Sequence, residues 1–335
     1  MQSSRLPTMK ELNPLLAPFQ TPAWKPAILQ MINTLLPYFA MMVLMYFSLR
    51  VSYALTLLLA IPTAGLLTRT FILFHDAGHN SFTPSLRANK IIAFLLGIMV
   101  LTPSEQWSKS HAIHHATSGN LDKRGVGDVA TLTVEEYRSK HWVERVAYQL
   151  FRFPFIMFGL GPLWMFVIHH RFAAPRYSKK ETNSVIWTNI GLVFYAAALS
   201  LLFGGFGNFV LIQLPVLWLG GMFGIWMFYV QHQFEGVYWS RSEEWDYVAS
   251  AMKGASFYRL PAVLNWFTGN IGYHHIHHLS PRIPNYRLQE CHASNPIFSQ
   301  EVKELGMFDA VRMVKCQLID ESRNNQMATF QDILG

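Results

Sequence analysis

The chain has 335 residues, of which 51% are hydrophobic, 14% are aromatic and only 14% are charged, with a formal net charge of +7. So few charged side chains cannot cover the surface of two or three soluble domains, and the composition is typical of an integral membrane protein. It argues against nucleic acid as a partner, because the sequence shows no basic module with interleaved aromatic residues. The two cysteines, Cys291 and Cys316, form no spaced motif and indicate neither a disulfide framework nor a thiolate metal site.

Four apolar runs are long enough to cross a bilayer, which takes about 20 residues. A short link around Arg50 joins the first two runs, and a glycine-rich turn at 204–208 joins the other two. We therefore expect an all-α protein with four transmembrane helices in two hairpins, whose long flanking segments share one side of the membrane. The expected spans are 27–47, 51–74, 185–203 and 209–230.

Lysine and arginine place that shared side in the cytoplasm. Of 27 such residues, 13 lie in 75–184 and nine in 231–335, whereas the opposite side carries only Arg50. The positive-inside rule therefore predicts a multi-pass protein of the cell membrane. The N-terminal residues show no signal-peptide pattern and are expected to stay in the cytoplasm. We expect one domain over 1–335, with cytoplasmic segments 1–26, 75–184 and 231–335.

The middle cytoplasmic segment contains three further features. The apolar run 91–101 is too short to span a bilayer and predicts a re-entrant or half-inserted helix. Thr133 and Glu136 form a capping box, which predicts a helix over 133–150. The aromatic run 153–168 favours an interfacial helix or a shallow hairpin over a full span.

Histidines are concentrated in three clusters on the predicted cytoplasmic side. His-x-x-x-His at 75–79 places two imidazoles on one face of a helix, because residues four apart share a face. His-x-x-His-His occurs at 111–115 and again at 274–278, and its adjacent histidines diverge by about 100° on a helix, so that they could serve two metals. His232 follows the fourth span much as His75 follows the second. Since neutral imidazole is a common ligand of iron, zinc and copper, the pattern predicts a dinuclear metal centre. The candidate ligands are His75, His79, His111, His114, His115, His232, His274, His277 and His278.

The other histidines and the nearby carboxylates are assigned differently. Asp76 could orient a ligand imidazole, and a solvated or helix-end role fits it equally well. His275 lies inside the third cluster, but on a helix it points about 100° away from His274, so we assign it an outer-shell or structural role. Surface, headgroup or packing roles are expected for His141, His169, His170, His275 and His292.

The three clusters, in their order, spacing and position relative to the spans, resemble those of the membrane fatty acid desaturases. The stretches HATSGNLDKRGVGD at 115–128 and HHIHHLSPRIPNYRL at 274–288 are similar to phospholipid desaturases of Bacillus, in the bacterial acyl-lipid branch of that family. The resemblance covers about residues 30–300. It implies a cytosolic helical cap in which the nine histidines named above hold two irons that act with O2.

The same resemblance implies the reaction and its partners. A cis double bond would be introduced into the acyl chains of membrane phospholipids, with electrons from an external donor. The sequence contains no His-Pro-Gly-Gly haem signature of a fused cytochrome b5 domain, so a soluble ferredoxin or flavodoxin is expected as the donor. Four basic residues could dock an acidic donor, or could instead bind anionic lipid headgroups. They are Arg171, Arg176, Lys179 and Lys180.

Two other functions compete with desaturation. Related di-iron membrane enzymes with similar histidine clusters hydroxylate their substrate or introduce a ketone. A histidine-rich membrane protein could also be a metal carrier, but carriers place their ligands near the bilayer midplane, whereas these histidines lie beyond the ends of the spans. In the fourth span, Gly220 and Gly224 could frame an acyl tunnel, and their spacing favours helix packing instead.

Overall fold

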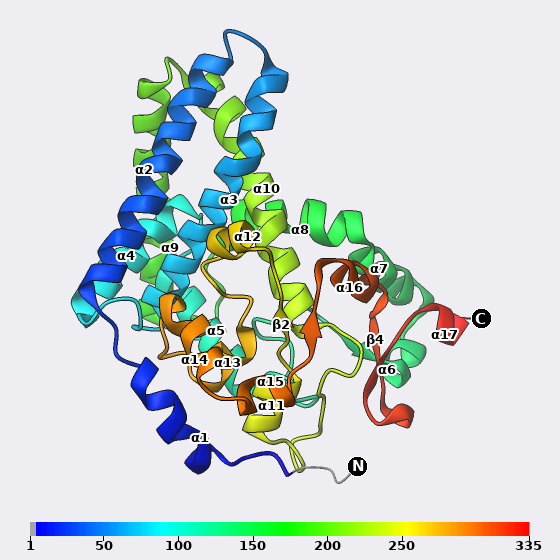
Figure 1. Cartoon of the computed structure of the whole chain (residues 1–335). Helices are drawn as coiled ribbons and strands as arrows, with labels where there is room; N and C mark the ends of the chain where they lie inside the picture. The colour runs from blue at the N-terminus through cyan, green and yellow to red at the C-terminus, as the bar shows by residue number, and fades with distance from the viewer. Residues whose placement is uncertain (1–4, 335) are drawn as a thin grey trace.

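The computed structural model describes residues 5–334. Within them, four helices are long and apolar enough to cross a membrane, which confirms the predicted number of spans. Figure 1 shows these helices as a bundle whose two tight links lie at its upper end, while both termini lie in the lower part. The four helices are α2 (Trp24–Ser48), α3 (Tyr53–Gly78), α9 (Lys179–Leu202) and α10 (Phe206–His232).

Two spans continue beyond the apolar runs that predict them. The second run ends at Phe74, but α3 continues to Gly78, and α10 likewise extends through His232. The added turns are polar and yet buried, with His75 only 3% and Asp76 only 1% exposed. These turns therefore lie inside the protein, where helical hydrogen bonding satisfies the backbone that water cannot reach.

α3 is the central helix of the bundle. It packs against α2, α10 and α4 (Leu86–Met99). In its most apolar stretch, 67% of the residues are buried, compared with 28%, 17% and 22% in the other three spans. The other spans therefore present most of their apolar surface outward, as expected for helices that contact lipid.

The segment after α3 is helical but bent. α4 covers most of the predicted 91–101 helix, but it starts five residues earlier and ends two residues earlier, and it meets α5 (Ser104–Thr117) at an angle of 101°. The capping box at Thr133 is present and starts α6 (Val134–Ser139). The prediction of one helix over 133–150 is wrong, because the backbone is extended at Lys140 and α7 (Trp142–Arg152) starts with its own cap at His141.

The aromatic run after α7 is a helix rather than a hairpin. It is built from η2 (Phe155–Leu160), α8 (Gly161–Leu163), η3 (Trp164–Ile168) and η4 (His169–Arg171), and it is bent by 66° from α7. Many of its apolar side chains are exposed, among them Phe155 at 62% and Trp164 at 61%. Such a surface is typical of a helix that contacts a membrane.

The remaining elements form a cap below the bundle, and a buried apolar cluster joins them to the end of α10. Two small sheets cross-connect distant parts of the chain: β1 pairs in parallel with β4, β4 pairs antiparallel with β5, and β2 pairs in parallel with β3. The helices of the cap outside 75–184 are α1 (Met9–Leu16), η1 (Ala17–Phe19), α11 (Tyr247–Lys253), α12 (Ala262–Phe267), α13 (His274–Leu279), α14 (Asn285–Ser294), α15 (Ile297–Gln300), α16 (Met307–Arg312), η5 (Met313–Lys315), η6 (Glu321–Arg323) and α17 (Gln331–Leu334). The strands are β1 (Leu132–Thr133), β2 (Phe257–Tyr258), β3 (Glu304–Leu305), β4 (Leu318–Asp320) and β5 (Gln326–Ala328).

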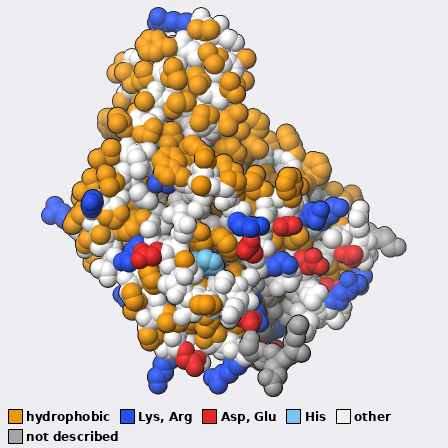
Figure 2. All heavy atoms as spheres, in the orientation of Figure 1, with side chains coloured by type: hydrophobic (Ala, Val, Ile, Leu, Met, Phe, Trp, Pro, Cys, Tyr) orange, Lys and Arg blue, Asp and Glu red, His pale blue; other side chains and the backbone are white. Residues whose placement is uncertain are grey.

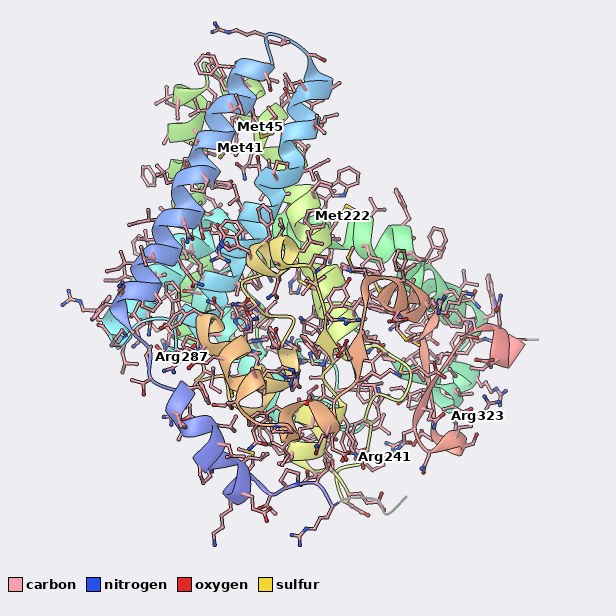
Figure 3. The ribbon with its side chains drawn as sticks, in the orientation of Figure 1. Met41, Met45, Met222, Arg241, Arg287 and Arg323 are labelled. Atoms are coloured by element: carbon pink, nitrogen blue, oxygen red, sulfur yellow. The ribbon has the colours of Figure 1, made fainter. Side chains whose placement is uncertain are left out.

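The two halves of the molecule differ in surface chemistry. On the face shown in Figure 2, hydrophobic side chains cover the bundle, whereas acidic and basic side chains gather on the cap. Figure 3 shows the same division, with Met41 and Met45 in the bundle and Arg241 and Arg323 in the cap. The division agrees with a protein whose bundle lies in lipid and whose cap lies in water.

Candidate metal centre

All nine histidines selected from the sequence come together where the bundle meets the cap. They form two groups, and within each group one ring nitrogen per histidine lies within 4.8 Å of the others. Eight of the nine side chains are buried, and His79 is partly buried. The first histidine group consists of His75, His79, His111, His115 and His277, and the second histidine group consists of His114, His232, His274 and His278.

The division between the groups follows helical geometry. In the α5 cluster, His111 and His115 belong to the first group and His114 to the second. In the α13 cluster the arrangement is reversed, since His274 and His278 belong to the second group and His277 to the first. Residues four apart are separated by about 40° around a helix, whereas the histidine between them lies about 60° from one of them and about 100° from the other. α5 thus contributes two histidines to the first group and one to the second, whereas α13 contributes one to the first group and two to the second.

Three histidines have a tautomer that their neighbours determine. The Nδ1–H of His114 donates to Asp128 Oδ1 at 2.5 Å, and the Nδ1–H of His232 donates to the carbonyl oxygen of Gly254 at 3.1 Å. In the first group, the Nδ1–H of His75 donates to Asp76 Oδ1 at 3.0 Å. When these three rings are neutral and carry one N–H each, their Nε2 atoms are bare lone pairs.

These lone pairs face other ring nitrogens. His114 Nε2 and His232 Nε2 lie 3.2 Å apart, although both rings already use their only N–H elsewhere. His232 Nε2 is also 2.9 Å from His274 Nε2. Two acceptors at this separation repel each other unless a cation lies between them, so the second group has the donor set of a metal site.

The first group shows the same mismatch. His111 Nε2 lies 3.0 Å from His75 Nε2 and 3.1 Å from His115 Nε2, so that three ring nitrogens converge. Both ring nitrogens of His277 are buried without a hydrogen-bond partner among the described residues, as is His79 Nε2. Buried polar atoms are rarely left unpaired, and a metal ion would satisfy them together. The residues of both groups therefore fit two metal ions.

Burial also keeps these rings in the form that binds metal. It lowers the pKa of His79, His111 and His277 well below the usual value, and neighbouring imidazoles lower it further. Burial and neighbouring imidazoles have the same effect on the pKa of His115, His274 and His278. The neutral imidazole that results is the metal-binding form.

The Asp76 carboxylate is itself held firmly. Its Oδ2 accepts from the backbone N–H of Asn285 at 2.6 Å and from the side-chain amide of Asn285 at 2.9 Å. Of the two roles left open for Asp76, the structure therefore shows contact with an imidazole and not a solvated side chain. Such contacts fix the orientation of a ligand ring.

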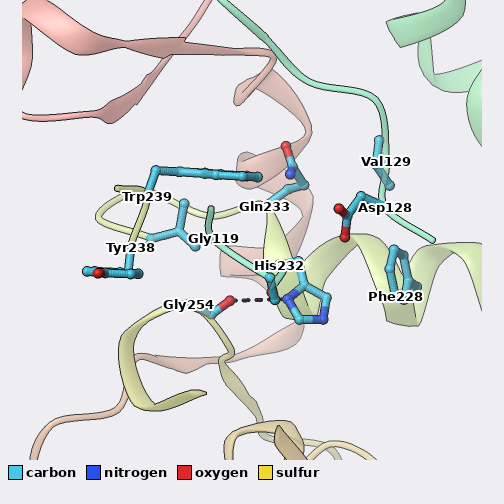
Figure 4. Close-up of a pocket in the computed structure, with 11 residues that line it drawn as sticks. Gly119, Asp128, Val129, Phe228, His232, Gln233, Tyr238, Trp239 and Gly254 are labelled. Atoms are coloured by element: carbon cyan, nitrogen blue, oxygen red, sulfur yellow. Dashed lines mark hydrogen bonds between the residues drawn. The ribbon is translucent and has the colours of Figure 1, made fainter. Parts of the chain in front are cut away.

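Aromatic side chains border both groups on the bundle side. The Trp107 indole stacks on His111 with ring centroids 4.5 Å apart, and Phe228 lies 5.1 Å from both His114 and His232. A small cavity lies beside the second group (Figure 4), with walls from His232, Asp128, Trp239 and neighbouring residues. It offers about 10 Å³ to the centre of a water molecule, which is room for about one water.

The other five histidines lie outside both groups. His275 is fully buried and its Nε2 lies 3.1 Å from His292 Nδ1, so the two form a pair on the far side of α13. His141 caps α7, and His170 is buried at the end of η4. Neither His275 nor His292 contributes to the groups found among the described residues.

Sequence reasoning missed two partners of the histidines, Asp128 and the Gly254 carbonyl, and it also missed Asn285, which donates to Asp76. Asp128 lies 14 residues after His114, and no helical spacing connects them. A signal was present in Gly125 and Gly127, which adopt φ of +105° and +73° and bend the chain so that Asp128 reaches His114. The backbone carbonyl of Gly254 leaves no signal in a sequence.

Comparisons with known proteins point in one direction. The sequence model of the family described as fatty acid desaturase matches residues 48–305. A fatty acid desaturase of Bacillus subtilis is 45% identical over 324 residues, which cover 97% of this chain and 91% of that protein. An sn-1 acyl-lipid omega-3 desaturase (ferredoxin) of Synechocystis is 27% identical over 69% of this chain and 64% of its own length. A chloroplastic sn-2 acyl-lipid omega-3 desaturase (ferredoxin) of Helianthus annuus is 28% identical over 70% of this chain and 54% of its own length.

Proposed function

Because the chain belongs to the fatty acid desaturase family and is therefore an oxidoreductase that acts on acyl chains, we propose that it uses two irons and O2 to introduce a cis double bond into the acyl chains of membrane phospholipids. Family membership supports desaturation over the hydroxylase and ketolase alternatives. The observation that carries the metal assignment is the pair of bare Nε2 atoms of His114 and His232, 3.2 Å apart in a buried site.

The nine histidines are the proposed ligands, five for one iron and four for the other. Two bound irons would supply the activation of O2 and the oxidation of an unreactive methylene pair, which no side chain can perform. The residues of the chain orient the imidazoles, and burial lowers the pKa of six of them, which favours the neutral form. Asp76, Asp128 and the Gly254 carbonyl each accept the Nδ1–H of one ligand and so direct its Nε2 toward the metal.

The position of the groups suits a lipid substrate. The last turns of α3 and α10 carry His75 and His232, so the groups lie at the ends of two membrane-spanning helices. Trp107 and Phe228 lie against the imidazoles and give the metal centre an apolar border on the side of the bundle. An acyl chain can then approach from the bilayer while electrons arrive from the aqueous side.

The cap would lie in the cytoplasm of a cell whose plasma membrane holds the bundle. The bias of lysine and arginine toward the cap supports this orientation. A cysteine that replaces Phe206, at the upper end of the bundle, should react with an impermeant reagent in intact cells. A cysteine that replaces the exposed Glu243 in the cap should react only after lysis. The opposite labelling pattern would reverse the orientation and move the metal site outside.

The electron donor would be a soluble reduced carrier, a ferredoxin or flavodoxin, that docks on the cap. The four basic residues expected to bind it are not equally free. Lys180 pairs with Glu105 at 2.7 Å, and Arg171 donates to Asn189 Oδ1 at 2.8 Å. Charge reversal of Arg176 and Lys179 is therefore the sharper test, and it should weaken donor-supported turnover more at low salt than at high salt. Intact turnover with looser binding to anionic lipid would assign these two residues to headgroups.

The main experiment is expression in a host whose membrane lipids are saturated. Extracted phospholipids should gain a cis double bond at one position, and purified protein should hold two irons per chain. Hydroxylated or oxidised chains without a double bond would contradict the proposed reaction. A protein that exchanges its irons freely and leaves lipids unchanged would instead be a carrier.

A further inference from the structure

Three glycines in α10 have different surroundings. A Cβ on Gly220 would lie 3.2 Å from Leu67 Cδ2 on α3, and a Cβ on Gly221 would lie 2.7 Å from Pro162 Cβ on α8. A Cβ on Gly224 would meet no atom within 4 Å. The expectation that Gly220 and Gly224 pack helices together is therefore correct for Gly220 and wrong for Gly224. The second packing glycine is Gly221.

The open space at Gly224 lies at a half-buried position on the face of α10 between the two glycines that pack against other helices. At about 100° per residue, Gly224 lies about 40° from Gly220 and about 60° from Gly221 around the helix axis. Its missing side chain thus points between α3, which Gly220 contacts, and α8, which Gly221 contacts. Close packing is normal in protein interiors, so an open position between two packed ones is a distinct feature.

Aromatic side chains line the way from this space to the metal centre. Phe71 of α3 lies 6.3 Å from Phe166 of η3 and 5.6 Å from Trp107 of α5, as measured between ring centroids. Phe228 follows Gly224 by one turn of α10. All four rings are only half-buried, although they come from helices that pack together. Rings that stay accessible between helices leave room for a flexible apolar molecule.

Two of these four rings contact the histidine groups. Trp107 stacks on His111 of the first group, and Phe228 contacts His114 and His232 of the second. From Gly224 to His232 the helix rises about 12 Å, at 1.5 Å per residue. The space at Gly224 is therefore one turn above the ring that touches the second group, on the side from which a lipid chain approaches.

We propose that the space at Gly224 holds a segment of the substrate acyl chain, and that the missing side chain at this position determines which carbons of the chain reach the metal centre. This inference rests on the proposed function and adds a residue that sets its specificity. A Cβ at Gly224 would meet no atom within 4 Å, unlike a Cβ at Gly220 or Gly221. A side chain here would shift or shorten the chain that fits between Phe71, Phe166 and Phe228.

The test compares Gly224→Ala and Gly224→Leu with a matched control, Gly207→Leu. Gly207 lies in the first turn of the same helix, and a Cβ there also meets no atom within 4 Å. One methylene in an apolar pocket changes discrimination by about tenfold or more. Gly224→Leu should therefore change the ratio of products, by double-bond position or by chain length, about tenfold or more. Gly224→Ala should cause a smaller change in the same direction, and Gly207→Leu should cause none.

A binding experiment makes the inference independent of turnover. A phospholipid with a photoreactive group along its acyl chain should label Phe228 in the metal-free protein, and Gly224→Leu should reduce that labelling about tenfold. Unchanged labelling, or a uniform loss of all products with the same product ratio, would overturn the inference. Thermal stability of each variant, measured in detergent, separates misfolding from a blocked path. If the unaltered protein produces no unsaturated lipid at all, the proposed function fails instead.

Discussion

The two histidine groups use their carboxylates in different ways. In the first group, Asp76 neighbours its imidazole in sequence, lies on the same helix and is 1% exposed. In the second group, Asp128 comes from an irregular loop 14 residues after His114, and 11% of its side chain is exposed. The other partners of the carboxylates differ as well. Asn285 donates twice to Asp76, whereas Asp128, besides its bond from His114, accepts a long contact of 3.3 Å from the Gly125 N–H among the described residues.

This difference shows that a helix positions the carboxylate of the first group, whereas a loop positions the carboxylate of the second. The first group depends on a buried network that the fold of α3 and α14 fixes in advance. The second depends on a loop whose conformation two glycines allow. Changes to Asp76 should therefore affect folding and metal together, whereas changes around Asp128 should mainly affect the metal.

The largest expected effect comes from removing a member of the second group. His232→Ala deletes one of four converging imidazoles and leaves only three. We expect about one iron per chain to be lost and desaturation to fall at least about 100-fold, since a ligand matters at least as much as the groups that orient it. Iron per folded chain and unsaturated lipid should both be measured.

His275→Ala is the matched control, because His275 lies in the same cluster but outside both groups. Loss of its contact with the partly buried His292 should cost about 1 kcal/mol of unfolding free energy. Two irons and measurable activity should remain. If His275→Ala loses iron while His232→Ala retains two irons and turns over, the ligand assignment is wrong.

The second prediction concerns Asp76→Asn, which should be the more severe of the two carboxylate changes. An amide at this position can place its N–H₂ against the two donors of Asn285. An unsatisfied buried donor costs about 1–3 kcal/mol, so the midpoint of chemical unfolding should fall. Iron affinity of the first group should fall about 10- to 100-fold. A variant with normal stability and normal iron affinity would show that the Asn285 network is not essential.

The sequence predicted the spans and the histidines for the same reason: both depend on local spacing. Apolar runs of about 20 residues mark the four spans, and i, i+4 spacing places His111 beside His115. The predicted span ends fell short at α3 and α10, because hydropathy ends at the last apolar residue while the helix continues into the buried histidine turn. The break at Lys140 was missed because the second cap, His141, is not a common N-cap residue.

The division into two groups could not be read from spacing alone. Helical geometry shows that His114 and His115 diverge, but not that His277 joins His111 while His274 joins His232. That depends on how α13 is oriented against α5, and tertiary packing sets this orientation. Asp128 and the Gly254 carbonyl were missed for the same reason, since each reaches its imidazole through a loop rather than along a helix.

The third prediction concerns Asp128→Asn, which should affect metal more than stability. The side chain is partly exposed and accepts few other hydrogen bonds, so we expect a change of less than about 1 kcal/mol in unfolding free energy. The amide is a weaker acceptor than the carboxylate for the Nδ1–H of His114, and iron affinity of the second group should fall about tenfold. Equilibrium titration with ferrous ion would measure this loss. An unfolding effect as large as that of Asp76→Asn would contradict the distinction between the two groups.

The smallest expected effect distinguishes two roles of the glycines in the Asp128 loop. One role is to let the backbone adopt a positive φ, and the other is to let the loop approach His114 closely. Gly127→Ala and Gly125→Ala both place a side chain at positive φ, which costs each variant about 1–2 kcal/mol. They differ in surroundings: a Cβ on Gly127 would lie 3.1 Å from His114 Cβ and from the Ser110 carbonyl oxygen, whereas a Cβ on Gly125 meets nothing within 4 Å. Only Gly127→Ala should push the loop away from α5 and weaken the contact between Asp128 and His114. We therefore expect similar losses of stability in the two variants, but a loss of iron affinity in the second group, up to about tenfold, in Gly127→Ala alone. Equal iron affinity in both variants would show that the loop needs its glycines for backbone conformation and not for its approach to His114.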